Sequence, residues 1–553
     1  MFRLLLRLCT RPVGFGLSSL ARGLLALLLR RRGVIELRLG VGESLGHRSR
    51  IADLEALLTQ PAVRGVVLRV GRLDWGWAQL QEWQKAISRV SDSGRFVLVA
   101  METAGNRETF LAMAATHVMM VPLGEVAVVG PAVHLQFYGA LLERLGVDVE
   151  LEAVGAYKSA GETVSSSHPS KESREALDEI VVGLHAQLVR AISEGRGLEP
   201  SRVEELIEQA PLTAEEALEA GLLDALGYEQ EIDDLLEELL GGPANRVGAG
   251  LGIRLVSWAR KCDAFLGDDP VIVVLHLDGP IASGGGGRRS GSQVESEVTV
   301  PIVRSLAQNP RVASVVLSID SPGGSALASD LIWREVELLN REKPVVASLG
   351  NVAASGGYYI AVGAAEIVAE PTTITGSIGV IGARLAPAAA LARLGVHGET
   401  ITQSESAKAW SSPGALPPRY RARLRARLEA VYETFLQRVS AGRRLPLEAV
   451  RPLAEGRVWS AEVAAENGLV DVLGGLEVAI IRARMLAGVR PLQLHRRIDI
   501  RPKARRSLVE WLLDRVKGPQ ALLSWVQVPR SARVLINHPS EALTLLPFDL
   551  DLS

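Results

Sequence analysis

Two segments of the chain set its fold: Val315-Val-Leu-Ser-Ile-Asp-Ser-Pro-Gly-Gly324 and Val345-Val-Ala-Ser-Leu-Gly-Asn-Val-Ala-Ala-Ser-Gly-Gly-Tyr-Tyr359. Each begins with a short apolar run and ends in a turn of small residues, after which a helix-like pattern starts. Short apolar runs between helices are typical of buried strands in an α/β fold with mostly parallel sheets. Similar runs occur elsewhere, at Val34–Leu39, Val66–Val70, Phe96–Val99 and Val271–Leu277.

The chain also consists of two related halves. Three sequence matches occur in the same order in both halves, at offsets of 249, 249 and 247 residues. One match could arise by chance, but three in order indicate an internal duplication. The matched pairs are Pro61–Leu68 with Pro310–Leu317, Leu145–Val147 with Leu394–Val396, and Thr213–Asp224 with Ser460–Asp471.

We therefore expect two tandem α/β repeats with appendages at both ends. The boundaries follow changes in composition, such as the Gly-Gly-Pro-Ala run that begins at Gly241. The predicted segments are an N-terminal stretch at residues 1–32, a first repeat at 33–240, a linker at 241–270, a second repeat at 271–485 and a C-terminal tail at 486–553.

Both ends of the chain have features of membrane contact. Residues 1–32 are largely apolar and carry seven arginines and no acidic residue. Because Arg22 interrupts the apolar run, a spanning anchor and a helix lying on anionic lipid both stay open. The tail is basic at 497–506 and amphipathic at 507–516, which fits either a membrane contact or a helix packed on the second repeat.

Composition excludes several other classes of protein. Lysine and arginine total 61 against 63 aspartates and glutamates, so the chain lacks the basic excess of a nucleic-acid-binding protein. The two cysteines, Cys9 and Cys262, belong to no Cys/His cluster, which indicates neither a zinc site nor a disulfide framework.

Ser355 is the candidate nucleophile. It lies among small residues where a strand pattern passes into a helix pattern, and a helix dipole favours negative charge at that end. The turn Asp320–Gly324 leaves backbone N–H groups able to face a ligand oxygen. Ser325 and Ser377 also lie beside glycines, but without a comparable set of partners.

A serine hydroxyl needs a base to become a nucleophile. None of the nine histidines lies in a segment that suggests a triad partner. A lysine can serve instead if burial lowers its pKa from about 10.4 so that it is neutral. Two lysines are candidates, Lys158 in the first half and Lys408 at nearly the equivalent place in the second, and the residues alone leave both open.

Three glycine-containing motifs follow one another in the second half: Asp-Ser-Pro-Gly-Gly from Asp320, Ala-Ser-Gly-Gly-Tyr-Tyr from Ala354 and Thr-Gly-Ser-Ile-Gly from Thr375. This order resembles the long form of bacterial signal peptide peptidase A, and the likeness covers roughly residues 33–485. That family shares its fold with crotonases and with the proteolytic subunit of Clp protease. The resemblance thus implies two tandem crotonase/Clp-protease-like repeats and a serine endopeptidase that uses a serine–lysine dyad.

The resemblance also implies roles for single residues. Ser355 is the nucleophile, and the backbone N–H groups of Gly323 or Gly324, with that of Gly356, form the oxyanion hole. Lys158 is the base by this comparison, because its segment is similar to the one that carries the base in long-form members. In single-unit relatives the lysine comes from the position of Lys408.

The first half has no intact nucleophile. At the 249-residue offset, Asn106 and Arg107 stand where the second half has Ser355 and Gly356. The resemblance therefore implies a division of labour, in which the first half gives the base and the second half gives the nucleophile. Such a site must form at a contact between the halves or between subunits.

By the same resemblance, the substrates are apolar peptides such as remnant signal peptides, and no metal or organic cofactor is needed. The protein is expected to form a homo-oligomer, a tetramer, associated with the bacterial inner membrane, with a cytoplasmic location still open. Two alternatives remain: a crotonase-type acyl-CoA enzyme with the same fold, and a non-catalytic membrane-associated scaffold.

Overall fold

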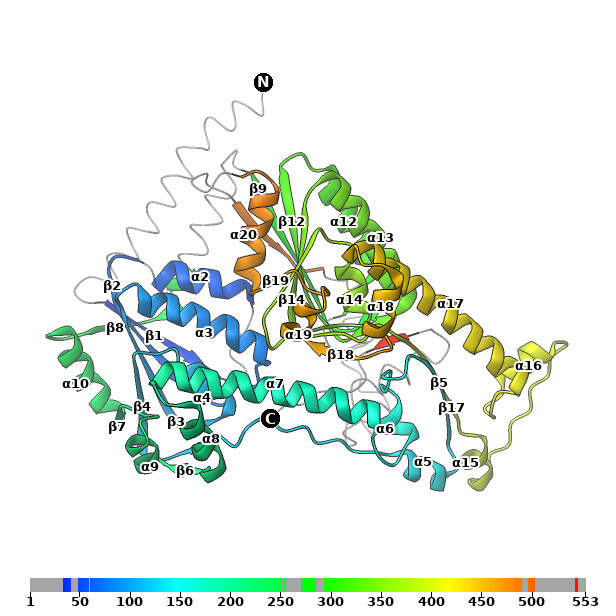
Figure 1. The fold of residues 1–553 in the computed structure, drawn as a ribbon, viewed down its shortest axis with the longest axis horizontal. Coiled ribbons are helices and arrows are strands. Elements are labelled where there is room, and N and C mark those ends of the chain that lie inside the picture. Colours follow the sequence, from blue (N-terminus) through cyan, green and yellow to red (C-terminus); the bar gives the residue numbers. More distant parts are fainter. Residues whose placement is uncertain are drawn as a thin grey trace.

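The computed structural model describes residues 33–40, 48–58, 60–250, 252–254, 270–284, 293–489, 496–502 and 543–545. The predicted N-terminal segment 1–32 and the amphipathic stretch 507–516 lie outside these residues. Among the helices of the described ranges, none combines the length and the apolar composition that a membrane crossing requires. Figure 1 shows the two repeats as two neighbouring lobes.

The first lobe is built on a seven-stranded sheet that is parallel except where β4 meets β6. The strand order is β6-β4-β3-β2-β1-β8, with β7 also paired to β4. The strands are β1 (Gly33–Leu39), β2 (Val63–Val70), β3 (Phe96–Gly105), β4 (His117–Ala127), β6 (Leu212–Thr213), β7 (Ala225–Leu226) and β8 (Asn245–Gly248). The last of these lies within the range predicted as a linker and pairs with β1 at the sheet edge.

Helices cover both faces of this sheet, as expected for parallel strands that are buried on both sides (Figure 1). The longest, α7, begins after Ser170, whose hydroxyl accepts a hydrogen bond from the Ser173 N–H, and ends at Gly197 with φ of 65°. The helices are α2 (Arg48–Leu58), α3 (Trp77–Asp92), α4 (Asn106–Ala112), α5 (Gly139–Leu145), α6 (Glu162–Ser165), α7 (Lys171–Arg196), α8 (Pro200–Gln209), α9 (Ala214–Glu219) and α10 (Glu229–Leu240).

The second lobe repeats this plan on an eight-stranded sheet. Its order is β18-β16-β14-β12-β9-β20, and β15 pairs with both β14 and β19. The strands are β9 (Val271–Asp278), β12 (Val312–Ser321), β14 (Val345–Ala354), β15 (Glu366–Ala369), β16 (Ile374–Gly376), β18 (Val458–Ser460), β19 (Val472–Leu473) and β20 (Arg496–Ile500). The helices of the second half are α12 (Ser296–Gln308), α13 (Ala326–Glu342), α14 (Gly356–Ala361), α15 (Ala388–Arg393), α16 (Glu405–Ser411), α17 (Pro418–Arg443), α18 (Leu447–Leu453), α19 (Ala461–Glu466) and α20 (Leu476–Leu486).

A third, six-stranded sheet takes strands from both halves and from the C-terminal tail. Its order is β11-β10-β13-β21-β17-β5. The strands are β5 (Asp148–Val154), β10 (Ile281–Ala282), β11 (Val294–Glu295), β13 (Gly323–Ser325), β17 (Val380–Ala386) and β21 (Leu543–Leu545). Within it, β5 of the first half pairs antiparallel with β17 of the second half over seven residues of each strand.

Side-chain contacts confirm the duplication predicted from the sequence. In the first lobe, Arg196 Nη1 donates a hydrogen bond to the Asp224 carboxylate at 2.8 Å. The same carboxylate accepts a second hydrogen bond from the Val118 N–H at 2.7 Å. In the second lobe, Arg443 and Asp471 form the same pair at 2.8 Å, and Asp471 accepts from the N–H of Ile367 at 2.7 Å. The mostly parallel α/β fold and its two repeats are thus confirmed.

The duplication extends to one close approach of backbones. Gly195, near the end of α7, lies so close to Met113 that an added Cβ would stand 2.4 Å from the Met113 carbonyl oxygen. Gly442, at the same place in α17, has the same relation to the Val362 carbonyl oxygen at 2.1 Å. Gly183, in the middle of α7, has no atom within 4 Å of such a Cβ.

We therefore expect opposite effects from alanine at these positions. Gly195→Ala and Gly442→Ala should lower the free energy of unfolding by about 1–3 kcal/mol, because the backbones must separate. Gly183→Ala should raise it by up to about 1 kcal/mol, through helix propensity alone. Thermal unfolding of the three variants tests this, and a melting temperature of Gly195→Ala or Gly442→Ala at or above that of the wild type would contradict it.

Candidate active site

The pairing of β5 with β17 joins two loops that lie far apart in the sequence. Val154, the last residue of β5, pairs with Val380, the first residue of β17. Lys158 follows shortly after β5, and Ser377 shortly precedes β17. Because the strands are antiparallel, both residues arrive at the same end of the sheet.

Ser355 reaches this point from β14, the strand beside β12. The carboxylate of Asp320, at the end of β12, accepts hydrogen bonds from the Asn351 side chain at 3.0 Å and from the Val352 N–H at 3.1 Å. The backbone then turns sharply, since Ser355 has φ of 55° and ψ of −113° and precedes the first turn of α14. A non-glycine residue with this backbone costs about 1–3 kcal/mol and persists only where its surroundings enforce it.

The side chains of Ser355 and Ser377 and the backbone carbonyl of Ser377 converge on the amine of Lys158. Its Nζ lies 2.7 Å from Ser355 Oγ, 2.9 Å from Ser377 Oγ and 2.9 Å from the Ser377 carbonyl oxygen. Both serines are fully buried, and Lys158 is 3% exposed. Burial lowers the pKa of the Lys158 amine well below its usual value, because a charged ammonium would lose its hydration there.

The contacts match the hydrogen-bonding capacity of a neutral amine. Such an amine has two N–H donors and one lone pair. The Ser377 carbonyl oxygen can only accept, so it takes one N–H, and Ser377 Oγ can accept the second. The lone pair is then left for the hydroxyl proton of Ser355, 2.7 Å away. This geometry lets Lys158 remove a proton from Ser355.

Two glycines make room for the lysine. A Cβ on Gly379 would stand 3.1 Å from Lys158 Cδ, and a Cβ on Gly456 would stand 2.6 Å from Lys158 Cβ. At both positions only backbone atoms face the Lys158 side chain, because a larger residue would collide with it. The Thr-Gly-Ser-Ile-Gly motif thus supplies both a ligand for the amine, Ser377, and part of the channel for its stem, Gly379.

A loop of the second half holds the two converging segments together. The Glu455 carbonyl oxygen accepts from the Tyr157 N–H at 2.7 Å, and the Arg457 carbonyl oxygen accepts from the Ser377 N–H at 2.6 Å. The guanidinium of Arg457 binds Glu175 at 2.6 Å and Glu179 at 2.7 Å, both on α7. This loop therefore ties the lysine segment of the first half to the Ser377 turn.

Two aromatic rings also contact the Arg457 guanidinium. Its guanidinium carbon lies 4.9 Å from the centre of the Tyr157 ring and 4.5 Å from that of Trp459. Tyr157 directly precedes Lys158, so the contacts of Arg457 also help to position Lys158, the candidate base.

The structure separates the predicted site residues into groups. Ser355 and Lys158 lie in hydrogen-bonding contact, whereas the side chain of Lys408 is exposed on α16. Gly323 and Gly324 have φ of 102° and 154° and lie in β13, and the Gly323 N–H points to Ser321 Oγ at 3.2 Å. The oxyanion role of these glycines and of Gly356 stays a prediction.

The first half has no such arrangement at the equivalent place. Asn106 stands where the second half has Ser355, and its side-chain amide exchanges two hydrogen bonds of 2.9 Å with the backbone of Gly130. The position is occupied by a buried structural contact, which fits the predicted loss of the nucleophile from this half.

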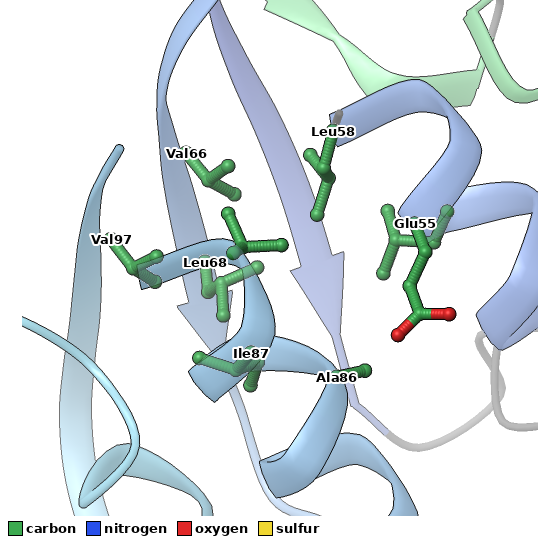
Figure 2. Close-up of a pocket in the computed structure, with 9 residues that line it drawn as sticks. Glu55, Leu58, Val66, Leu68, Ala86, Ile87 and Val97 are labelled. Carbon is green, nitrogen blue, oxygen red and sulfur yellow. The ribbon is translucent and has the colours of Figure 1, made fainter. Parts of the chain in front are cut away.

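One apolar pocket of the first lobe lies apart from these residues. Figure 2 shows it between α2, α3 and the strands β2 and β3. Its one charged lining residue, Glu55, forms an ion pair with Arg89 at 2.7 Å. The lining contains no pair of a nucleophilic side chain and a base. Within the described ranges, no group of histidine, cysteine, aspartate or glutamate side chains could hold a metal ion.

Comparison with known families decides what kind of site this is. The pattern of peptidase family S49 matches residues 89–241 and again residues 337–490, together more than half of the chain. The chain belongs to peptidase family S49. The two matched ranges fall one in each repeat.

Named relatives agree with this assignment. The chloroplastic serine protease SPPA of Arabidopsis thaliana is 32% identical over 78% of this chain, which covers 64% of that protein, slightly less than two thirds. Protease 4 of Salmonella typhi is 30% identical over 84% of this chain and 73% of its own length. Protease 4 of Haemophilus influenzae is 28% identical over 85% and 78%, respectively.

The S49 assignment makes the chain a serine peptidase and places the pair of Ser355 and Lys158 in a proteolytic family. The acyl-CoA enzyme and the scaffold have no support of this kind. Sequence reasoning proposed Ser355 and the two alternative lysines, and it gave no role to two other residues that lie beside Ser355 and Lys158, namely Ser377 and Arg457. Ser377 was passed over for lack of partners that only the fold supplies, and Arg457 has no local motif that marks it.

Arg457→Met should lower kcat for peptide hydrolysis by roughly 10- to 100-fold while leaving KM unchanged, because a displaced base slows the chemical step more than binding. Arg451→Met is the matched control, since Arg451 pairs at 3.0 Å with Glu433 on the exposed surface. Steady-state kinetics on a fluorogenic peptide measures both variants. Equal kcat for Arg457→Met and Arg451→Met would contradict a positioning role for Arg457.

Proposed function

We propose that this S49 peptidase hydrolyses peptide bonds with Ser355 as nucleophile and Lys158 as general base, both supplied by one chain. The observation that carries the proposal is the 2.7 Å contact between Lys158 Nζ and Ser355 Oγ in a site where both side chains are buried. The contact favours Lys158 over Lys408, whose side chain is exposed on α16.

The reaction proceeds in two halves. Lys158 takes the hydroxyl proton of Ser355 as Oγ bonds to the carbonyl carbon of the substrate, and backbone N–H groups of Gly323 or Gly324 and Gly356 stabilise the oxyanion. The C–N bond then breaks as Lys158 passes its proton to the leaving amine. Water next attacks the acyl-serine, Lys158 takes the proton of that water, and Ser355 recovers its hydroxyl as the acid leaves.

The substrates are apolar peptides, with remnant signal peptides as the expected class. The support is the resemblance of the three glycine-rich motifs to signal peptide peptidase A and the name of the Arabidopsis relative, serine protease SPPA. The arginine-rich apolar segment 1–32 supports a place at a membrane surface, as expected for an enzyme of the bacterial inner membrane.

A homo-oligomer, in the form of a tetramer, is part of the same proposal. Exposed apolar side chains lie at equivalent places of the two repeats: Leu145 is 54% exposed and Leu394 is 78% exposed. The segments touch, since the Ala390 N–H donates to the Gly146 carbonyl oxygen at 2.9 Å. This patch is the expected contact between copies, and a native mass equal to that of a single chain would refute it.

The serine–lysine assignment predicts a clear order among three variants. Ser355→Ala should abolish hydrolysis of an apolar fluorogenic peptide, and Lys158→Met should lower kcat/KM by at least roughly 100-fold, the size of a general-base contribution. Lys408→Met is the matched control, because it removes an exposed lysine and should keep the wild-type rate. An inactive Lys408→Met with an active Lys158→Met would show that the base comes from the second half instead.

The wild-type enzyme should also lose activity toward acid in a defined way. Because burial lowers the pKa of Lys158, the base is neutral above this lowered value and protonated below it. The value of kcat/KM should therefore rise with pH through that lowered pKa and then level off, with the plateau beginning well below the usual lysine range.

A further inference from the structure

Helix α3 of the first half lies on the side of its lobe that meets the second lobe (Figure 1). Its polar contacts with the second half are hydrogen bonds from the Leu476 N–H to Glu82 at 2.8 Å and from the Thr372 N–H to Gln81 at 3.1 Å, and an ion pair between Lys85 and Glu370. The apolar core of the first lobe also includes Ala354, the residue directly before Ser355, which is fully buried there. The first half therefore packs against the Ser355 turn, in addition to contributing Lys158.

The N-terminus of α3 is capped by a residue of the other half. Gly76 occupies the N-cap position and has no side chain that could accept a hydrogen bond. The first N–H groups of a helix are usually satisfied by a serine, threonine, aspartate or asparagine side chain at that position. Here the side-chain oxygen of Asn351 accepts a hydrogen bond from the N–H of Gln79, the third residue of α3, at 3.0 Å. Asn351 lies in β14, four residues before Ser355, so a strand of the second half caps a helix of the first.

Gly76 leaves the space that this contact needs. A Cβ at residue 76 would stand 2.2 Å from Asn351 Cγ and 2.3 Å from the Asn351 side-chain oxygen. Any larger residue would therefore displace the Asn351 amide. The glycine of the first half and the asparagine of the second half fit each other as a pair.

The nitrogen of the same amide holds the turn that contains the predicted oxyanion glycines. Asn351 Nδ2 donates to one carboxylate oxygen of Asp320 at 3.0 Å, and the other oxygen accepts from the Val352 N–H at 3.1 Å. Asp320 is the first residue of the turn that ends at Gly324. One side chain thus connects α3, the strand that leads to Ser355 and the turn that leads into β13.

We propose that Asn351 is a positioning residue through which α3 of the first half fixes the backbone of the Ser355 turn. Ser355 has φ of 55°, a conformation that persists only where the surrounding structure enforces it. The two hydrogen bonds of the Asn351 amide hold the end of the strand that leads into this conformation. The first half then orients the nucleophile as well as contributing the base. This inference rests on the proposed function for the role of Ser355 as nucleophile.

Asn351→Ala should lower kcat for an apolar fluorogenic peptide by roughly 10- to 100-fold at unchanged KM, because a serine displaced by about 1 Å reacts more slowly. Asn340→Ala is the matched control. The Asn340 side chain accepts from the Val345 N–H at 3.1 Å, at the end of β14 away from Ser355, so its loss should leave kcat unchanged. An Asn351→Ala chain that is folded and retains the kcat of Asn340→Ala would overturn the proposal.

An exchange of side chains tests the hydrogen bonds themselves. Asn351→Asp should be as slow as Asn351→Ala, because its carboxylate would face that of Asp320. Asn351→Asp combined with Asp320→Asn restores all three hydrogen bonds, with one of them reversed in direction, and should bring kcat back to within roughly threefold of the wild type. A folded double variant no faster than Asn351→Asp would contradict the proposed link.

The same loss should be obtained from the first half alone. Gly76→Ala should lower kcat as Asn351→Ala does, because its methyl group displaces the Asn351 amide. Gly71→Ala is its control, since a Cβ there would have no atom nearer than 3.7 Å, and it should keep the wild-type kcat. A wild-type kcat in Gly76→Ala would show that α3 does not act on the Ser355 turn.

Amide hydrogen exchange followed by mass spectrometry tests the link without catalysis. Asn351→Ala should take up deuterium faster than the wild type both at residues 76–83 of the first half and at residues 350–356 of the second, and the double variant should restore both rates. Unchanged exchange at residues 350–356 in Asn351→Ala would overturn the proposal. Absence of hydrolysis in every chain, the wild type included, together with the expected changes in exchange would support the link and sink the peptidase mechanism proposed for Ser355.

Discussion

The rest of this site depends on the burial of the Lys158 amine among serine oxygens, because burial disfavours the charged ammonium relative to the neutral amine. If Lys158 were charged, it would need a counter-ion, and its three hydrogen-bonding contacts to Ser355 and Ser377 do not include one. Neutral, it finds an acceptor in the Ser377 carbonyl, a second in Ser377 Oγ and a donor in Ser355. The same burial lowers the pKa of the amine, which is what the proposed role of Lys158 as a general base requires.

The duplication explains how such a site can be built. In each repeat, the same arginine–aspartate pair and the same close helix approach hold the lobe together, so both halves keep their structural parts. The halves differ at one equivalent position. The first half has Asn106 there, hydrogen-bonded to the Gly130 backbone, and the second half has Ser355, in contact with Lys158. Strand β5 of the first half pairs with β17 of the second half in the third sheet and so brings Lys158 to Ser355; neither repeat alone contains both residues.

Much of the fold can be predicted from the sequence. The pairing of residues in the candidate site cannot, because it depends on contacts between distant parts of the chain. Apolar runs such as Val315–Ile319 predict buried parallel strands because only their length and flanking turns matter, and the internal matches predict two repeats. The choice between Lys158 and Lys408 depends on the pairing of β5 with β17, a long-range contact without a local pattern. The same holds for Arg457, which contacts Glu175 and Glu179 on α7 of the other half.

The central claim, that neutral Lys158 activates Ser355, is tested most directly by covalent labelling of Ser355 with a small fluorophosphonate over a range of pH. The reagent reports the reactivity of the serine itself and needs no knowledge of the natural substrate. The account predicts that labelling of the wild type rises with pH through the lowered pKa of Lys158, that Lys408→Met behaves identically, and that Lys158→Met is scarcely labelled at any pH. Labelling of Lys158→Met at the wild-type rate, with the same pH dependence, would contradict it.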